Sequence, residues 1–223
     1  ALFGWTRAEV LGKRFVDFLL PAPVQARLTT ELAQLDQDQL PPYSVNDNLT
    51  RDGRVITCDW FNAWLPERPG EPREVVSLAI HITDRRRLEE QIHQLAFFDP
   101  LTGLPNRRLL HDRIERVIAA ARRNGHHAAL MFLDLDNFKP LNDTRGHEVG
   151  DLLLIDAAQR LKGSLRATDT VARFGGDEFV VLLGDLDGDQ EQARAQAEGI
   201  ASKILAGLAE PYRLARPDGA GTV

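Results

Sequence analysis

The pattern of apolar and polar positions over residues 1–83 predicts a small mixed domain. Residues 6–12 start with a candidate N-cap, have an acid three residues later and end in glycine, which predicts a short helix. Apolar positions in residues 24–35 predict a second helix. Two extended runs flank residues 51–53, Arg-Asp-Gly, which is typical of a hairpin, and residues 73–84 form a third extended run. We therefore expect an antiparallel sheet accompanied by helices.

Residues 84–98 predict a connecting helix. Leu88, Ile92 and Leu95 are spaced four and three apart, as in the seam of a short coiled coil. The pattern lasts little more than one heptad. It fits a helix that pairs with a second copy of itself, and it fits a solvated linker about equally well.

From residue 99 onward the pattern alternates between helix and strand. Helices are expected at 106–125, 150–165 and 189–208, and strands at 128–138, 170–174, 179–183 and from 211. Helices packed on a sheet that contains a hairpin make an α/β (α+β) domain.

Composition narrows the function classes. The formal net charge of −6 argues against a protein that coats polymeric nucleic acid, although a single nucleotide remains possible. Cys58 is the only cysteine, so no internal disulfide can form, and a reducing compartment fits. With no signal peptide and no apolar run long enough to span a bilayer, a cytoplasmic location is expected, and a longer parent protein could still be anchored in a membrane.

The stretch RFGGDEF places acids beside an apolar strand. Gly175 and Gly176 between two apolar runs predict a two-residue hairpin loop with positive φ at both positions. Glycines also let a ligand approach the backbone closely. Asp177 and Glu178 then lie at the start of the second strand, either as functional acids or as polar residues at the rim of a turn.

A second acidic cluster ends the strand at 128–138. Asp134 and Asp136 are two residues apart, so in a strand both point to one face. If this strand neighbours the hairpin, Asp134 approaches Asp177 or Glu178, and converging carboxylates suit Mg²⁺. The alternative is that the two acidic clusters lie apart and each simply faces solvent.

The segment between the clusters offers groups for a nucleotide. Asn142 and Asp143 suit a turn, and Asp151 lies near the start of a helix. An amide and a carboxylate together also match guanine, because the amide meets the N7/O6 edge and the carboxylate accepts from N1 and N2. Lys139 can oppose phosphate.

Residues 99–214 resemble the GGDEF-domain diguanylate cyclases. The resemblance is carried by four motifs that occur in the order of that family: DPLTGLPNRR, FLDLDNFKPLND, GHEVGD and RFGGDEF. The resemblance implies a ferredoxin-like sheet of the nucleotidyl-cyclase and polymerase-palm type. It implies condensation of two GTP molecules into cyclic di-GMP with release of pyrophosphate, Mg²⁺ or Mn²⁺ as cofactor, and a homodimer that brings two GTP molecules together.

The resemblance also implies roles for individual residues. Asp134 and Asp177 match the metal-binding acids, with the Leu135 carbonyl as a further ligand and Glu178 assisting. Asp177 also matches the base that takes the 3′-hydroxyl proton.

Further positions match the substrate site. Asn142 and Asp151 correspond to guanine contacts, and Lys139 and His147 correspond to residues that flank the substrate. Gly175 and Gly176 are also expected at the substrate site.

A regulatory motif precedes the hairpin. Arg166 and Asp169 match the family's RxxD product-inhibition site; the alternative is an arginine that ends a helix and an aspartate in a turn.

Residues 1–83 resemble a PAS sensor domain. The resemblance is carried by the motif ALFGWTRAEVLG, the RDGR hairpin and the motif IHITDRRRLEEQ, whose last residues extend into the connecting helix. No flavin-attaching cysteine motif or haem ligand stands out, so the PAS ligand is unknown. We expect three parts: the PAS-like domain (1–83), the connecting helix (84–98) and the GGDEF domain (99–223). Both domains are expected to be truncated, with little turnover by the fragment alone.

Three functions remain open: a sensor-linked diguanylate cyclase, a silent GGDEF domain that acts as a receptor for GTP or cyclic di-GMP, and a dimerising PAS sensor whose output lies elsewhere.

Overall fold

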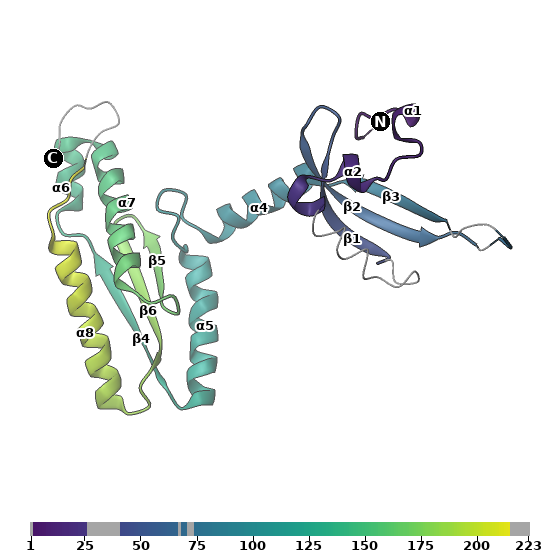
Figure 1. Cartoon of the computed structure of the whole chain (residues 1–223). Helices are drawn as coiled ribbons and strands as arrows, with labels where there is room; N and C mark the ends of the chain where they lie inside the picture. Colours follow the sequence, from purple (N-terminus) through teal and green to yellow (C-terminus); the bar gives the residue numbers. More distant parts are fainter. Residues whose placement is uncertain (1, 26–40, 67, 71–73, 215–223) are drawn as a thin grey trace. The chain divides into compact units, whose positions relative to one another are not determined.

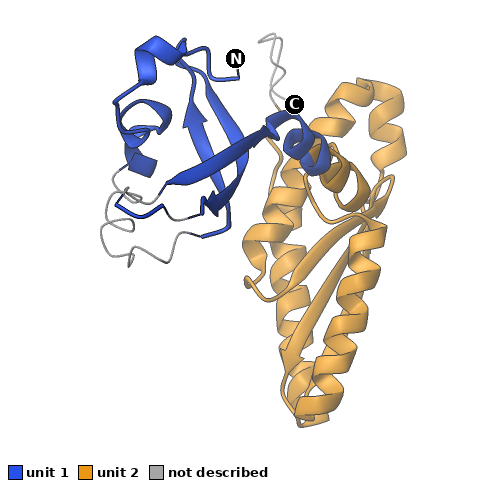
Figure 2. Cartoon of the chain, turned by 90° about the vertical axis from the view of Figure 1, so that its right-hand side faces the viewer, with its two compact units in different colours: residues 1–90 blue, residues 91–223 orange. Residues whose placement is uncertain are grey.

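The computed structural model describes residues 2–25, 41–66, 68–70 and 74–214. The chain divides into two compact units, residues 1–90 and residues 91–223, which Figure 2 distinguishes by colour. Each unit has its own three-stranded sheet. Over the described ranges, no helix is both long enough and apolar enough to cross a membrane.

The first unit is built on an antiparallel sheet of order β1-β2-β3 (Figure 1). Its elements are α1 (Arg7–Val10), α2 (Val16–Leu19), β1 (Tyr43–Leu49), β2 (Val55–Trp64) and β3 (Val75–His81). The predicted hairpin is confirmed, with Leu49 paired to Val55 across residues 51–53. The predicted short helix is confirmed as α1, and its capping box is present. The second predicted helix, 24–35, lies mostly outside the described residues.

The core of this unit lies on one face of its sheet. Ile56 and Cys58 of β2 are buried. The buried Asn48 donates to the Leu19 carbonyl at 3.3 Å and accepts from the Trp60 indole at 3.0 Å, so its polar groups are satisfied. Burial raises the pKa of the Cys58 thiol, which fits a packing role.

The helix α4 (Thr83–Phe97) follows β3 and matches the predicted connecting helix within one residue at each end. Its seam is exposed: Leu88, Ile92 and Leu95 retain 58%, 64% and 73% of their accessible surface. Nothing in the described part of the chain covers these three side chains.

The elements of the second unit run in the order α-β-α-α-β-β-α along the chain. Its elements are α5 (Arg107–Asn124), β4 (His127–Asp134), α6 (Phe138–Arg145), α7 (His147–Ser164), β5 (Thr170–Gly175), β6 (Glu178–Leu186) and α8 (Gln190–Ala209). The strand order is β4-β6-β5, and both outer strands are antiparallel to β6. The pair α6–α7 therefore crosses over between two parallel strands, as in the expected ferredoxin-like arrangement.

Helices cover both faces of this sheet, α7 and α8 on one side and α5 on the other (Figure 1). The larger core joins Leu154 and Leu161 of α7 to Phe179 and Val181 of β6. The smaller core lies under α5 and includes Leu110, Val180 and Leu182. Both faces of β6 are thus buried, which explains its uninterrupted apolar run.

Local predictions around α6 and α7 are wrong. Asn142 and Asp143 lie inside α6, in place of the predicted turn, and α7 begins at His147, three residues before the predicted helix start at 150. Asn137, at φ +61°, is the N-cap of α6, and Gly146, at φ +86°, separates α6 from α7. Packing of α6 on α7 overrides the turn preference of Asn and Asp.

The strand predicted from residue 211 is also wrong within the described range, because residues 211–214 form no strand. A side chain of α7 instead holds the end of α8 and the start of this segment. Arg160 of α7 donates to the carbonyls of Gly207, Glu210 and Pro211, and its guanidinium lies 3.7 Å from the centre of the Tyr212 ring.

Candidate active site

The hairpin between β5 and β6 turns one residue later than predicted. Gly175 still pairs with Glu178, so the two turn residues are Gly176 and Asp177. Among the described residues of this turn only Gly176 has a positive φ, +52°, so the prediction of positive φ at both Gly175 and Gly176 is wrong. The acid Asp177 therefore stands at the tip of the hairpin, where a ligand can reach it.

The end of β4 lies beside this hairpin. Asp134 is directly opposite Glu178 in the antiparallel register, so their side chains share one face of the sheet. Their neighbours Leu133 and Phe179 pack into the larger core on the α7 and α8 side. The two carboxylates therefore emerge on the α5 side, next to the turn that carries Asp177.

The second acid of the predicted pair lies elsewhere. The strand β4 ends at Asp134, and Asp136 occupies the turn that leads to α6. The alternation argument therefore does not apply to Asp136. Leu135, between them, has left the strand ladder, and its carbonyl oxygen accepts from the Phe138 N–H at 3.3 Å, which leaves its second lone pair for another partner.

These donors fit a magnesium ion in their chemistry. Asp134, Glu178 and Asp177 supply carboxylate oxygens and Leu135 a carbonyl oxygen, and Mg²⁺ binds through one or two carboxylates and completes its shell with water and phosphate. Across the described ranges, no three histidine, cysteine, aspartate or glutamate side chains gather into a metal-binding group.

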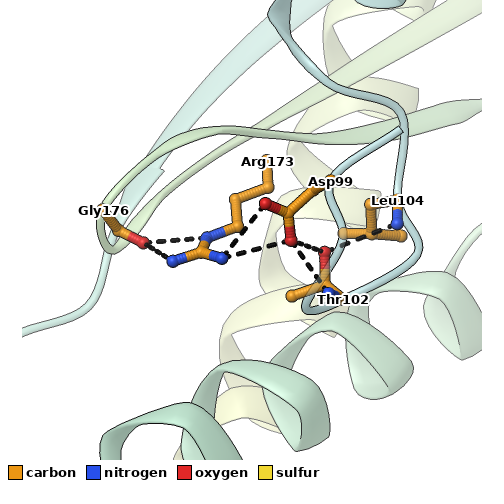
Figure 3. Close-up of polar contacts among 5 residues, drawn as sticks. All are labelled: Asp99, Thr102, Leu104, Arg173 and Gly176. Atoms are coloured by element: carbon orange, nitrogen blue, oxygen red, sulfur yellow. Dashed lines mark hydrogen bonds and ion pairs between the residues drawn. The ribbon is translucent and has the colours of Figure 1, made fainter. Parts of the chain in front are cut away.

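One arginine fixes the hairpin (Figure 3). Arg173 of β5 donates through Nε and Nη2 to the Gly176 carbonyl at 2.9 and 2.6 Å. Its Nη1 donates to both carboxylate oxygens of Asp99 at 3.1 and 3.2 Å. Asp99 also accepts from the Thr102 amide and hydroxyl at 2.8 and 2.7 Å. The loop 99–104 is therefore tied to the turn that carries Asp177.

This ion pair is largely shielded from solvent. The Arg173 and Asp99 side chains retain 14% and 18% of their accessible surface. Burial alone would raise the pKa of Asp99, but the hydrogen bonds from Thr102 and then the Arg173 guanidinium outweigh it and lower the pKa. Asp99 is thus held in its charged form. The motif DPLTGLPNRR was recognised from sequence, but this contact was missed; its only signals were an Asp-x-x-Thr turn and a lone arginine in a buried strand.

The predicted guanine contacts come together where α6 packs on α7. Asn142 of α6 lies against Gly150 of α7, and Asp151 is the next residue of α7. The Asn142 Oδ1 is buried and has no hydrogen-bond partner in the described part of the chain. Lys139, in the first turn of α6, and His147, the first residue of α7, are both exposed.

The RxxD motif borders a separate cavity of about 330 Å³. The Arg166 backbone N–H donates to Asp169 Oδ2 at 3.1 Å, so the two residues form a closed turn. The cavity is also lined by the cations Arg113 and Lys162, which the sequence interpretation did not include.

Comparisons with known proteins cover both units. The profile of the family "Diguanylate cyclase, GGDEF domain" matches residues 96–220, and the PAS fold profile matches residues 1–87. Diguanylate cyclase DgcP of Pseudomonas aeruginosa is 51% identical over 164 residues, which cover 74% of this chain and 22% of DgcP. Diguanylate cyclase TpbB of the same organism is 43% identical over 122 residues, 55% of this chain and 27% of TpbB. The chain thus spans about a quarter of the length of these relatives.

Solved structures agree with these matches. The GGDEF domain of TpbB (YfiN) from Pseudomonas aeruginosa superposes with a TM-score of 0.51 at 43% identity, over 56% of this chain and 69% of that chain. The coiled coil and GGDEF domain of DgcB from Caulobacter crescentus, in complex with c-di-GMP, superposes with a TM-score of 0.51 at 28% identity, over 61% of this chain and 68% of that chain.

Proposed function

We propose that this chain, which belongs to the diguanylate cyclase GGDEF family and has a PAS domain before its GGDEF domain, is the sensor-linked catalytic part of a diguanylate cyclase. The observation that carries the proposal is the register that sets Asp134 opposite Glu178, beside Asp177 at the hairpin tip. The substrate is GTP, and the products are cyclic di-GMP and pyrophosphate.

In this proposal Asp134, Asp177 and Glu178, with the Leu135 carbonyl, hold Mg²⁺ or Mn²⁺. The ion, when bound, lowers the cost of charge at the phosphate under attack. Asp177 takes the proton of the attacking 3′-hydroxyl as that oxygen bonds to the α-phosphorus of the other GTP and pyrophosphate leaves. Asp177 is half-buried in the turn, between the exposed Gly176 and Glu178, which suits a base that must reach a nucleotide.

The chain's other site residues hold the nucleotide. Asn142 and Asp151 recognise guanine, because a donor beside an acceptor complements the O6 and N1–H edge of that base. Lys139 and His147 are exposed at the starts of α6 and α7, where they can meet phosphate. Gly175 and Gly176 allow the nucleotide to approach the hairpin backbone.

The product is two-fold symmetric, so two GGDEF domains must meet, each with one GTP. The exposed seam of α4 (Leu88, Ile92 and Leu95) supports a homodimer through this helix. Control by product is proposed at Arg166 and Asp169, where the cavity has cations for phosphate. The PAS domain is proposed as the sensor that sets activity.

The decisive experiment uses the full-length protein that carries this sequence. Incubation with GTP and Mg²⁺ should yield cyclic di-GMP by mass spectrometry, and Asp177→Ala should reduce the rate on the order of a hundredfold or more. The control Glu191→Ala, in the first turn of α8, should keep the wild-type rate. Tight binding of GTP or cyclic di-GMP without product would select the silent receptor instead, and absence of both would leave the PAS sensor as the function.

A further inference from the structure

Gly150 makes room for the amide of Asn142. A Cβ built at position 150 would overlap the Asn142 Oδ1 and lie 2.9 Å from its Cγ and 3.3 Å from its Nδ2. Non-bonded carbon atoms pack at about 3.5–4 Å, so any side chain at position 150 would displace the amide. Gly150 is itself buried in α7.

The reason for glycine here is steric. Gly150 has no positive φ, and glycine is a poorer helix former than alanine, so neither backbone conformation nor helix propensity favours it. Gly163 in the same helix has open space around its Cβ position in the described structure. The close contact with Asn142 therefore distinguishes Gly150 from a glycine that the helix merely tolerates.

The contact also orients the amide. Since Oδ1 is enclosed against Gly150 without a donor, Nδ2 is the end of the Asn142 amide left to meet a ligand. The next residue of α7, Asp151, can only accept hydrogen bonds while it is ionised. A donor beside an acceptor matches the O6 and N1–H edge of guanine, whereas adenine presents the opposite order at the same edge.

We propose that Gly150 is a positioning residue for base selection: it seats the Asn142 amide so that Nδ2 donates to guanine beside the Asp151 carboxylate. This inference rests on the proposed function, since it assigns the guanine site of the same domain. It adds that selectivity for guanine over adenine depends on a missing side chain at position 150.

The test compares Gly150→Ala with Gly163→Ala in the full-length protein. Gly150→Ala should weaken GTP binding by calorimetry, and raise the KM for GTP, at least tenfold with kcat within about threefold of wild type. Its preference for GTP over ATP should fall by the same factor. Gly163→Ala should leave affinity and preference unchanged. Both variants should keep a cooperative thermal transition.

A third variant separates displacement of Asn142 from a general change in the helix. Asn142→Ala should weaken GTP binding as Gly150→Ala does, and the double variant should bind no more weakly than Asn142→Ala alone. Additive losses, or a Gly150→Ala variant with wild-type affinity and base preference, would overturn the inference. Binding is measured separately from turnover, so the two proposals can fail separately. A wild type that binds GTP without making product would refute the cyclase proposal. The GTP affinities of the variants would still decide the role of Gly150.

Discussion

The ion pair between Arg173 and Asp99 offers the sharpest test of how the hairpin is held. Asp99→Asn keeps the shape of the side chain and an acceptor for Thr102 but removes the charge that faces the Arg173 guanidinium. The guanidinium would still donate through Nε to the Gly176 carbonyl, but its Nη1 would lose the charged carboxylate that holds it in place. The hairpin tip with Asp177 should therefore become less ordered.

The cost follows from the low exposure of this pair. Hydrogen bonds to charged groups away from water contribute about 1.5–3 kcal/mol, whereas exposed ion pairs contribute about 0.2–1 kcal/mol. With 14% and 18% of the two side chains accessible, we expect Asp99→Asn to lower the free energy of unfolding by about 2 kcal/mol. A double-mutant cycle with Arg173→Gln should give a coupling energy of about 1–2 kcal/mol.

The assay is urea unfolding followed by circular dichroism, with Glu198→Gln as the matched control. Glu198 accepts from Arg194 at 2.7 Å, a shorter contact, but these side chains retain 64% and 80% of their surface. The control should cost less than about 0.5 kcal/mol. If Asp99→Asn cost no more than Glu198→Gln, burial would not decide the strength of this pair and the reasoning would be refuted.

The same pair predicts a pH dependence. The folded state lowers the pKa of Asp99 below its ordinary value of 3.8, so the stabilisation is fully present above that value and is lost as pH falls through the folded pKa. The difference in stability between wild type and Asp99→Asn should thus be constant near neutral pH and shrink below about pH 4. A difference that grew on acidification would contradict the assigned direction.

Three further variants test other parts of the molecule. Arg160→Ala should lower the free energy of unfolding by about 2 kcal/mol in urea, because it removes the donors to three carbonyls at the end of α8 and just beyond it, and the contact with Tyr212. Ile92→Glu should weaken self-association about tenfold in analytical ultracentrifugation, since a charge enters the seam of α4; an unchanged dimer constant would refute the seam. Arg166→Ala should raise the cyclic di-GMP concentration for half-inhibition on the order of tenfold, and unchanged inhibition would refute the RxxD site.

Elements with strong periodicity were predictable. The helix α5 begins at the N-cap Asn106, which accepts from the amides of Arg108 and Leu109, and ends at Gly125 with φ +71°. Each signal involves only residues at its own end of the helix, so it can be recognised without knowledge of the rest of the fold. The connecting helix and the strands β4 to β6 were predictable as elements because their apolar patterns are also local, although the predicted end of β4 was four residues too late.

Segments whose conformation depends on packing were not predictable. Asn142 and Asp143 have turn propensity but lie in α6 because that helix packs on α7. Asp136 follows the strand alternation in sequence, yet β4 ends before it. The turn of the β5–β6 hairpin shifted by one residue because Gly175 pairs with Glu178, and a pairing register depends on both strands and on the core beneath them.

By itself, the order of residues determined the types of element, the family resemblance and the set of acids available for a metal. Tertiary structure decided which of those acids meet: the antiparallel register sets Asp134 opposite Glu178 and leaves Asp136 outside the strand. It also decided that Arg173 binds Asp99, 74 residues away in sequence. Contacts of this kind form only when the strands are aligned by burial of both faces of the sheet, and no short stretch of sequence contains that information.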